Sequence, residues 1–295
     1  MEASQFYMIT IFTPEFNRAH LMPRLHESLC KQTYRDFEWV IVDDGSVDDT
    51  KSLSLSLSAR EGTFFPIRYF YQENGGKHRA INRGVKEARG ELFFIADSDD
   101  ILPPDALERT ARVYDDIKDD LSFAGVCGLD SDFNGQVIGS GLPKNVIDDT
   151  SINIRFKYGV TGDMKEVFRT DVLKEFPFPE IDGERFCPEM LVWNRIATKY
   201  KLRYFNQVIY LAEYQTDGIS SGIVKVRMLS PISSMMTYEE LVQYPDVPIK
   251  EQMKAAINYW RFCFCSKPIS YSNNMWKYFW VIPFAYFIHL MDLHK

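Results

Sequence analysis

The chain of 295 residues is long enough for one large domain or two small ones. Apolar residues make up 45% of it and charged residues 25%, which is typical of a globular protein with a buried core. The net charge is −7 and no block of basic residues stands out, so nucleic acid is not expected as a partner.

The cysteines and the first residues indicate a reducing compartment. Only seven residues precede Met8 and none is basic, so we expect no secretory signal. The cysteines are scattered and odd in number, which predicts free thiols and a cytoplasmic location. They are Cys30, Cys127, Cys187, Cys263 and Cys265. Cys263 and Cys265 have no second pair nearby at zinc-ligand spacing, which argues against a zinc site.

The first 130 residues alternate strand and helix patterns. Apolar runs predict strands at 7–12, 40–42, 67–71 and 92–96. Leu21, Leu25 and Leu29 recur at helical spacing, and apolar positions at 80–88 predict a further helix. Residues 52–58 alternate Ser and Leu as in a half-buried strand, but a crossover is needed there, which favours a helix. This order predicts an α/β fold with a mostly parallel sheet flanked by helices.

Two predicted strands end in carboxylates. Asp97, Asp99 and Asp100 follow the 92–96 run, and Asp43 and Asp44 follow the upstream strand. The carboxyl edge of such a sheet is where ligands bind. Crowded carboxylates suit Mg²⁺, which takes one or two of them and completes its shell with substrate phosphates. The alternative is that these acids only cap the helices that follow.

The later chain carries weaker signals. Residues 130–180 show Gly, Asp and Asn turns with few long apolar runs, whereas 189–199 predicts a helix and 202–211 a strand. Residues 225–265 look helical. The aromatic segment 276–291 is too short to span a bilayer. It fits either an interfacial helix or a terminal helix packed on the domain, and Pro283 is expected to kink it.

Six motifs, in their order and spacing, resemble those of family 2 glycosyltransferases over about residues 5–110. They are Thr13-Pro14-Glu15-Phe16-Asn17-Arg18, Gln32-Thr33, Val42-Asp43-Asp44-Gly45-Ser46, Asn74-Gly75-Gly76-Lys77, Asn82-Arg83-Gly84 and Asp97-Ser98-Asp99-Asp100. The resemblance implies a GT-A fold, Rossmann-like, with a helical, aromatic-rich C-terminal extension. We expect a domain at 1–222, divided into a nucleotide-sugar half (1–110) and an acceptor half (111–222), and an extension at 223–295.

The resemblance also implies an activity. It is the inverting, metal-dependent transfer of a hexosyl group from a nucleotide-diphosphate sugar to a hydroxyl. The acceptor would be a glycan or a lipid-linked precursor in surface polysaccharide assembly, with a membrane surface as a possible partner. Mn²⁺ or Mg²⁺ is the expected cofactor.

Site residues are carried over by position in the motifs. Asp99 and Asp97 would meet the metal. Asp44 would face the base with Asp43 supporting it, and Lys77 would reach the phosphates unless it is only a cation at a helix start. The substrate-binding set is Thr13, Pro14, Glu15, Asp43, Asp44, Asn74, Gly75, Lys77, Asp97 and Ser98.

The catalytic base is expected at Glu189. Relatives carry Glu-Asp before a Trp and an Arg on a helix, and here Pro188-Glu189 precedes Trp193 and Arg195. Pro188 replaces the usual Glu, so Glu184 is the fallback, and Glu189 could instead be a solvated acid at a helix start. His78 and a late loop with Tyr214, Asp217 and Ser220 could contact the donor or be structural.

Two other classes of function stay open. A sugar nucleotidyltransferase would use a similar sheet, but the first twenty-five residues lack a Gly-rich signature with a following Arg and Lys. A non-catalytic carbohydrate-binding relative is the other, and the retained acids argue against it.

Overall fold

The computed structural model describes residues 6–213, 222–266, 268–269 and 271–294. The chain forms two compact units. The first holds the described residues up to Pro177 together with Ile196–Glu213, and the second holds Phe178–Arg195 and the described residues from 222 onward.

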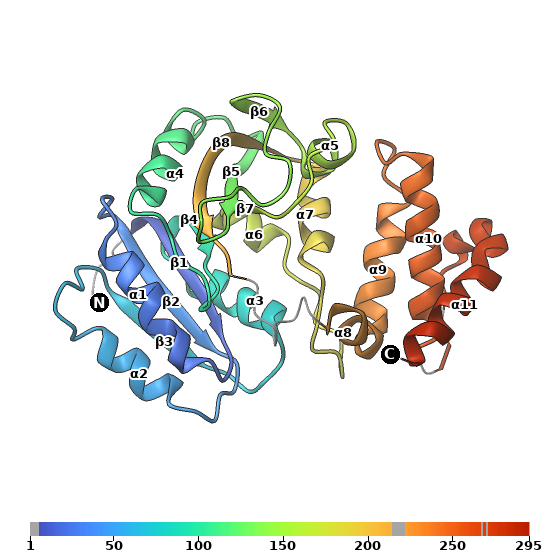
Figure 1. Ribbon diagram of the computed structural model, residues 1–295, viewed down its shortest axis with the longest axis horizontal. Helices are drawn as coiled ribbons and strands as arrows, with labels where there is room; N and C mark the ends of the chain where they lie inside the picture. The colour runs from blue at the N-terminus through green and yellow to red at the C-terminus, as the bar shows by residue number, and fades with distance from the viewer. Residues whose placement is uncertain (1–5, 214–221, 267, 270, 295) are drawn as a thin grey trace. The chain divides into compact units, whose positions relative to one another are not determined.

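The first unit is built on an eight-stranded sheet of order β3-β2-β1-β4-β7-β5-β8-β6 (Figure 1). Strands β3, β2, β1 and β4 are parallel, β7 runs antiparallel between β4 and β5, β8 is parallel to β5, and β6 is antiparallel to β8. The carboxyl ends of six strands and the amino end of β7 therefore share one edge. The strands are β1 (Tyr7–Glu15), β2 (Phe37–Asp43), β3 (Ile67–Tyr71), β4 (Gly90–Ile95), β5 (Phe123–Ser131), β6 (Val146–Asp149), β7 (Met164–Arg169) and β8 (Lys201–Leu211).

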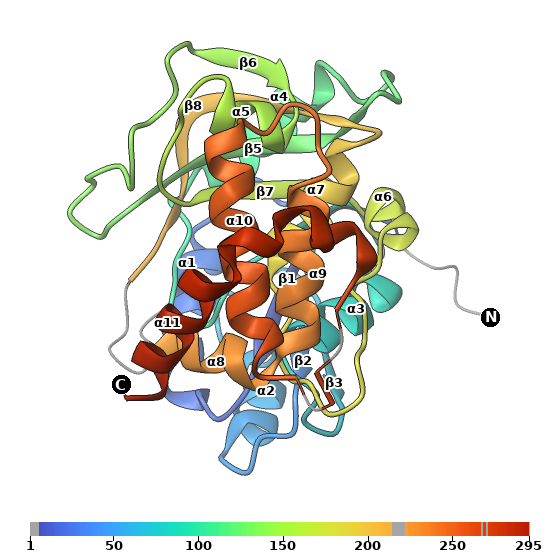
Figure 2. The ribbon, with the colours of Figure 1, turned by 90° about the vertical axis from the view of Figure 1, so that its right-hand side faces the viewer.

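Helices cover both faces of the parallel strands, which is why strand β2 is buried at every position. Ile9 and Ile11 of β1 belong to the core cluster that includes Leu25 of α1. Phe12 points the other way, and a Cβ added at Gly84 of α3 would lie 2.2 Å from its ring. Figure 2 shows α1 on one side of these strands and α3 with α6 on the other. The helices of this unit are η1 (Ala19–Leu21), α1 (Met22–Cys30), α2 (Thr50–Leu57), α3 (Lys77–Glu87), α4 (Ala106–Asp115), α5 (Ser151–Phe156) and α6 (Thr170–Glu175).

The predicted strands at 7–12, 67–71 and 92–96 are confirmed by β1, β3 and β4, and residues 52–58 fall in helix α2. The emphasis on turns over 130–180 was wrong for β7, which lies in the middle of the sheet. The sequence Met-Lys-Glu-Val-Phe-Arg holds no long apolar run, because half of its side chains are only partly buried. Its place depends on pairing with strands distant in the chain, which no local pattern records.

The second unit is helical. Helix α9 packs on α10, and α10 also contacts α11 and the 3-10 segment η3. In Figure 2 the dark-red η3 and α11 cross in front of α10. Arg195 of α7 donates to both carboxylate oxygens of Glu240 on α9, at 2.6 and 2.9 Å. The elements are α7 (Glu189–Ala197), whose last two residues belong to the first unit, α8 (Ile223–Leu229), α9 (Pro231–Leu241), α10 (Ile249–Cys263), η3 (Asn273–Val281) and α11 (Ile282–Leu293).

The expectation of a kink at Pro283 was wrong. Pro283 lies in the first turn of α11, where a missing N–H leaves no intrahelical bond unmade. The change of direction instead falls within η3, where Tyr278 has a non-helical backbone. Among the described residues, no helix combines the length and the apolar character needed to cross a bilayer.

Candidate active site

The acids that follow β4 are each held by a cation from another element. Lys77, at the start of α3, lies 2.8 and 2.9 Å from the two carboxylate oxygens of Asp97. Arg18 donates to Asp99 Oδ2 at 2.7 Å, and Arg24 of α1 donates to the carbonyl oxygen of Asp99. The predicted pair Asp97 and Asp99 thus lies beside three basic side chains.

The pKa values differ along this short run. Burial alone would raise the pKa of Asp97, but Lys77 and Lys165 hold it below its ordinary value. Burial and the negative charge of Asp97 raise the pKa of Asp99, and they raise that of Asp100 to about 6. Asp97 is therefore the acid whose charge the surrounding cations stabilise most.

Strand β7 brings a further cation to this edge because it runs antiparallel. Lys165 lies near the beginning of β7, with its Nζ 3.5 Å from the centroid of the Tyr210 ring at the end of β8. The Tyr210 hydroxyl accepts a hydrogen bond from the Asp97 backbone N–H at 2.8 Å. Sequence reasoning missed Lys165 and Tyr210, since only the sheet pairing places them beside Asp97.

At the end of β2, Asp44 organises the loop that follows β3. Its carboxylate is 3% exposed and accepts from the side chains of Gln72 and Asn74 and from the backbone N–H groups of Gly75 and Gly76, at 2.7–3.1 Å. The predicted residues Asp44, Asn74, Gly75 and Lys77 therefore belong to one hydrogen-bonded corner. Contact between Asp44 and a nucleotide base stays a prediction, and the structure gives this acid a second task.

Gly45 allows the corner to form. Its φ of +86° favours glycine, as its place after two acids predicts. A Cβ there would also lie 2.7 Å from the backbone nitrogen of Asn74. A side chain at this position would push the 72–76 loop away from β2.

Thr13 and Asp43 use their side chains to build the same edge. The Thr13 hydroxyl accepts from the indole N–H of Trp39 at 2.9 Å. Asp43 accepts from the Ser46 backbone N–H at 2.8 Å and from the Tyr69 hydroxyl at 2.6 Å. Pro14 follows Thr13 in β1 and pairs in register with Val42 of β2.

Glu15, the last residue of β1, is a buried acid. It is 1% exposed, and neither carboxylate oxygen has a hydrogen-bond partner among the described residues. Burial raises its pKa to about 7, while the nearby Ser98 hydroxyl and Arg18 backbone N–H oppose the rise. Glu15 is thus the one residue of the first predicted motif whose side chain can change charge near neutral pH.

The candidates for the base lie in the second unit. Glu189 is the first residue of helix α7 and is partly exposed. Glu184 is buried and accepts from the backbone N–H groups of Ile232 and Ser233 and from the Ser233 hydroxyl, at 2.6–2.8 Å. Glu184 therefore caps α9, which argues against it as the fallback base. Tyr214, Asp217 and Ser220 lie outside the described residues.

The acidic edge suits a metal that arrives with a diphosphate. Asp97 and Asp99 supply the one or two carboxylates that such an ion takes from protein, and both side chains are partly exposed. Their cations, Arg18 and Lys77, are equally able to pair with phosphate oxygens. No cluster of three or more acid, His or Cys side chains placed to hold a metal occurs within the described parts of the chain.

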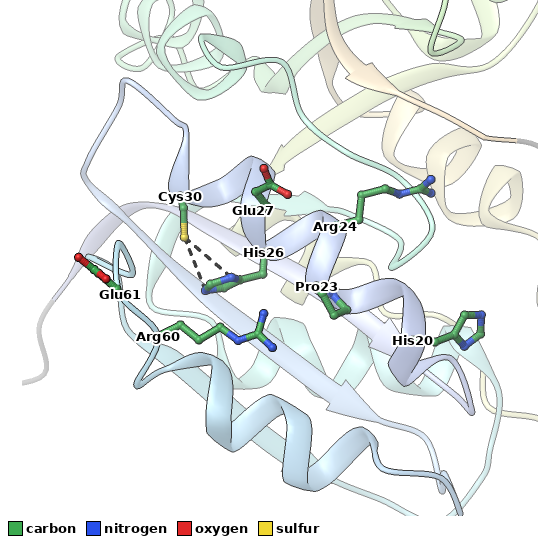
Figure 3. Close-up of a pocket in the computed structure, with 8 residues that line it drawn as sticks. All are labelled: His20, Pro23, Arg24, His26, Glu27, Cys30, Arg60 and Glu61. Carbon is green, nitrogen blue, oxygen red and sulfur yellow. Dashed lines mark hydrogen bonds between the residues drawn. The ribbon is translucent and has the colours of Figure 1, made fainter.

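A separate hollow of about 480 Å³ lies along α1 (Figure 3). His26 contacts Cys30 there, with the sulfur 3.6 Å from Nε2. Burial raises the pKa of the Cys30 thiol and lowers that of His26, so neither is charged at neutral pH. None of the predicted site residues lines this hollow.

Comparison with solved structures identifies the class of fold. The chain superposes on *S. aureus* TarS (residues 1–349, in complex with UDP-GlcNAc) with a TM-score of 0.60 at 20% identity, over 87% of this chain and 81% of that one. The mannosyltransferase PcManGT from Pyrobaculum calidifontis, in complex with GDP-Man and Mn²⁺, gives 0.59 at 17%, over 96% and 74%. The fold is GT-A, as expected.

Sequence comparison identifies the family. The profile of Glycosyl transferase family 2 matches residues 10–163, and the chain belongs to this family. It is 33% identical to the glycosyltransferase GlyG of Streptococcus pneumoniae over 72% of both chains. It is 32% identical to an uncharacterized glycosyltransferase of Rickettsia felis over 50% of this chain, and it spans only 24% of that relative's length.

Proposed function

We propose that the protein transfers a hexosyl group from a nucleoside-diphosphate sugar to an acceptor hydroxyl, with inversion at the sugar carbon. The observation that carries this is the pairing of Asp97 and Asp99 with Lys77 and Arg18 at the carboxyl edge of the sheet. Four side chains with exchangeable ion-pair partners at one edge suit a diphosphate and its counterion. Family membership and the GT-A fold support the same reaction.

The residues of the first unit would bind and orient the donor. The 72–76 loop, held by Asp44, sets the start of α3 and with it Lys77. Lys77 and Arg18 would turn from their carboxylates to the phosphates and balance the charge that the leaving diphosphate gains. Thr13, Pro14, Glu15 and Ser98 would line the nucleotide side of this edge.

We propose that Asp99 and Asp97 hold Mn²⁺ or Mg²⁺ together with the diphosphate. The bound ion would supply Lewis-acid stabilisation of the departing diphosphate. Without a diphosphate, the two carboxylates keep Arg18 and Lys77 as partners.

Glu189 is the proposed base. An acceptor hydroxyl is a weak nucleophile, so a carboxylate must take its proton as the sugar carbon is attacked. The capping role of Glu184 leaves Glu189 as the acid of that segment available for this task.

For the acceptor we propose a glycan or a lipid-linked precursor of a surface polysaccharide, modified in the cytoplasm. The 135-residue division we expect, with acceptor contacts in 111–222, stays part of this proposal, as do the roles of Tyr214, Asp217 and Ser220.

The test is a screen of nucleotide sugars by thermal shift, with and without Mn²⁺, followed by a transfer assay. A ligand that binds the folded state raises its stability. We expect one donor class to stabilise the protein only with the metal and to yield nucleoside diphosphate. Release of pyrophosphate from a nucleoside triphosphate would instead assign a nucleotidyltransferase, and binding without turnover a carbohydrate-binding protein.

A further inference from the structure

Helix α11 is amphipathic in the reverse sense for a soluble protein. Its inward stripe consists of Ala285, His289 and Asp292, all buried. Asp292 pairs with Arg261 of α10, and His289 contacts Cys265 and the ring of Phe264. The polar side chains of α11 thus face α10, whereas a helix on a water-exposed surface normally turns them outward.

The outward side of η3 and α11 is aromatic. Five side chains on it are each 53–59% exposed, and we call them the aromatic face. The aromatic face consists of Trp276, Phe279, Trp280, Phe284 and Phe287. An exposed apolar patch of this kind marks a contact surface.

Two observations indicate what covers the aromatic face. Residues 271–294, all of which the structure describes, contain a single acid, Asp292, whose side chain is 2% exposed and ion-paired. A chain of net charge −7 therefore presents an outer side here that bears no carboxylate and one exposed cation, Lys277. From 279 to 293 the exposed side chains offer hydrogen bonds only through Trp280 and Tyr286, too few to recognise sugar hydroxyls.

We propose that the aromatic face inserts into the headgroup layer of an anionic membrane. Trp and Tyr favour that layer, and apolar side chains on a helix lying in it bury themselves among the acyl chains. Lys277 would contact anionic lipid, and the hidden Asp292 removes the repulsion that an exposed acid would cause. The helix binds in the plane of the membrane, since α11 has only 12 residues.

The experiment measures sedimentation of the full chain with vesicles of phosphatidylglycerol and phosphatidylethanolamine, with no donor or acceptor present. The variant Trp280→Ser/Phe284→Ser/Phe287→Ser removes three exposed rings. We expect vesicle binding to fall on the order of a hundredfold. The matched control is Val47→Ser/Leu55→Ser/Leu121→Ser, three exposed apolar residues of the first unit. We expect the control to bind as the parent does and both variants to keep the parent's melting temperature.

A second variant tests the charge. Lys277→Glu should weaken binding to the anionic vesicles several-fold and leave binding to phosphatidylcholine vesicles unchanged. A blue shift of tryptophan fluorescence on vesicle addition should accompany binding.

Three results would overturn the proposal. The first is a full chain that stays in the supernatant. The second is binding that the triple variant retains. The third is a dimer that forms without lipid and is lost in the triple variant while vesicles do not bind, which would assign the face to a second copy. Because no sugar is present, a failure of the proposed glycosyl transfer leaves all three measurements interpretable.

Discussion

Asp99 and Asp97 share a strand end but differ in their partners. Asp97 is gripped by Lys77 through both oxygens, whereas Arg18 reaches Asp99 through one. The pKa of Asp99 is also raised by burial and by Asp97, so a neighbouring cation gains more by binding there. This makes Asp99 the acid whose loss should matter most.

We expect Asp99→Asn to lower metal-dependent transfer on the order of 100-fold, because the amide keeps the shape and loses the charge. Initial rates across a Mn²⁺ titration would measure this. Asp115→Asn, an exposed acid at the end of α4, is the control and should match the parent. Parent-like activity of Asp99→Asn after chelation would remove the metal role.

Glu189 and Glu184 give a second residue-scale pair. Glu189→Gln should nearly stop transfer and leave donor affinity and melting temperature unchanged, because only basicity is lost. Glu184→Gln should instead keep most activity and lose about 1 kcal/mol of stability, since the charged cap of α9 is weakened. If the two results were exchanged, the base would lie five residues earlier than proposed.

At the scale of elements, the 72–76 loop depends on one side chain. Four donors converge on Asp44, and two of them are backbone N–H groups that nothing else in the corner satisfies as well. We expect Asp44→Ala to reduce affinity for a nucleoside diphosphate roughly ten- to a hundredfold, because each buried donor left unpaired costs about 1–3 kcal/mol.

Calorimetry with the free nucleotide measures that affinity. Gln72→Ala removes a single donor and serves as the graded control, with a smaller loss. Unchanged affinity in Asp44→Ala would separate the loop from the donor site.

The local signals found the parallel half of the sheet and the acids at its edge. β1, β3 and β4 are continuous apolar runs, and the Gly45 turn follows from residue type alone. Lys165 and Tyr210 could not be found this way, because their positions depend on the β4–β7 and β5–β8 pairings. The capping bonds of Glu184 likewise join segments 48 residues apart.

At the scale of the whole molecule, several buried acids make stability depend on pH. Burial raises the pKa of Glu15 and of Asp130 to about 7, and Asp100 titrates near 6. Between the unfolded value and the raised value, the folded state holds a proton that the unfolded state has released. The free energy of unfolding therefore falls as the pH rises through this range.

Glu15→Gln removes one such group. We expect the variant and the parent to match near pH 4 and the variant to become more stable with rising pH, by up to about 3 kcal/mol at pH 8. Denaturant unfolding at several pH values measures the difference. Glu61→Gln, an exposed acid, should show none. A constant difference between Glu15→Gln and the parent across pH would mean that Glu15 is ionised throughout.

The place of β7 in the sheet has a consequence for synthesis on the ribosome. The first four strands of the chain can pair as soon as residue 95 has emerged, but the free edge of β4 is covered only by Met164–Arg169. At 5–20 residues per second, the 68 intervening residues leave an apolar strand with unpaired backbone groups for roughly 3 to 14 seconds. Such an edge is a template for aggregation. Nascent chains stalled between residues 96 and 163 should therefore recruit chaperones more strongly than chains stalled beyond 175.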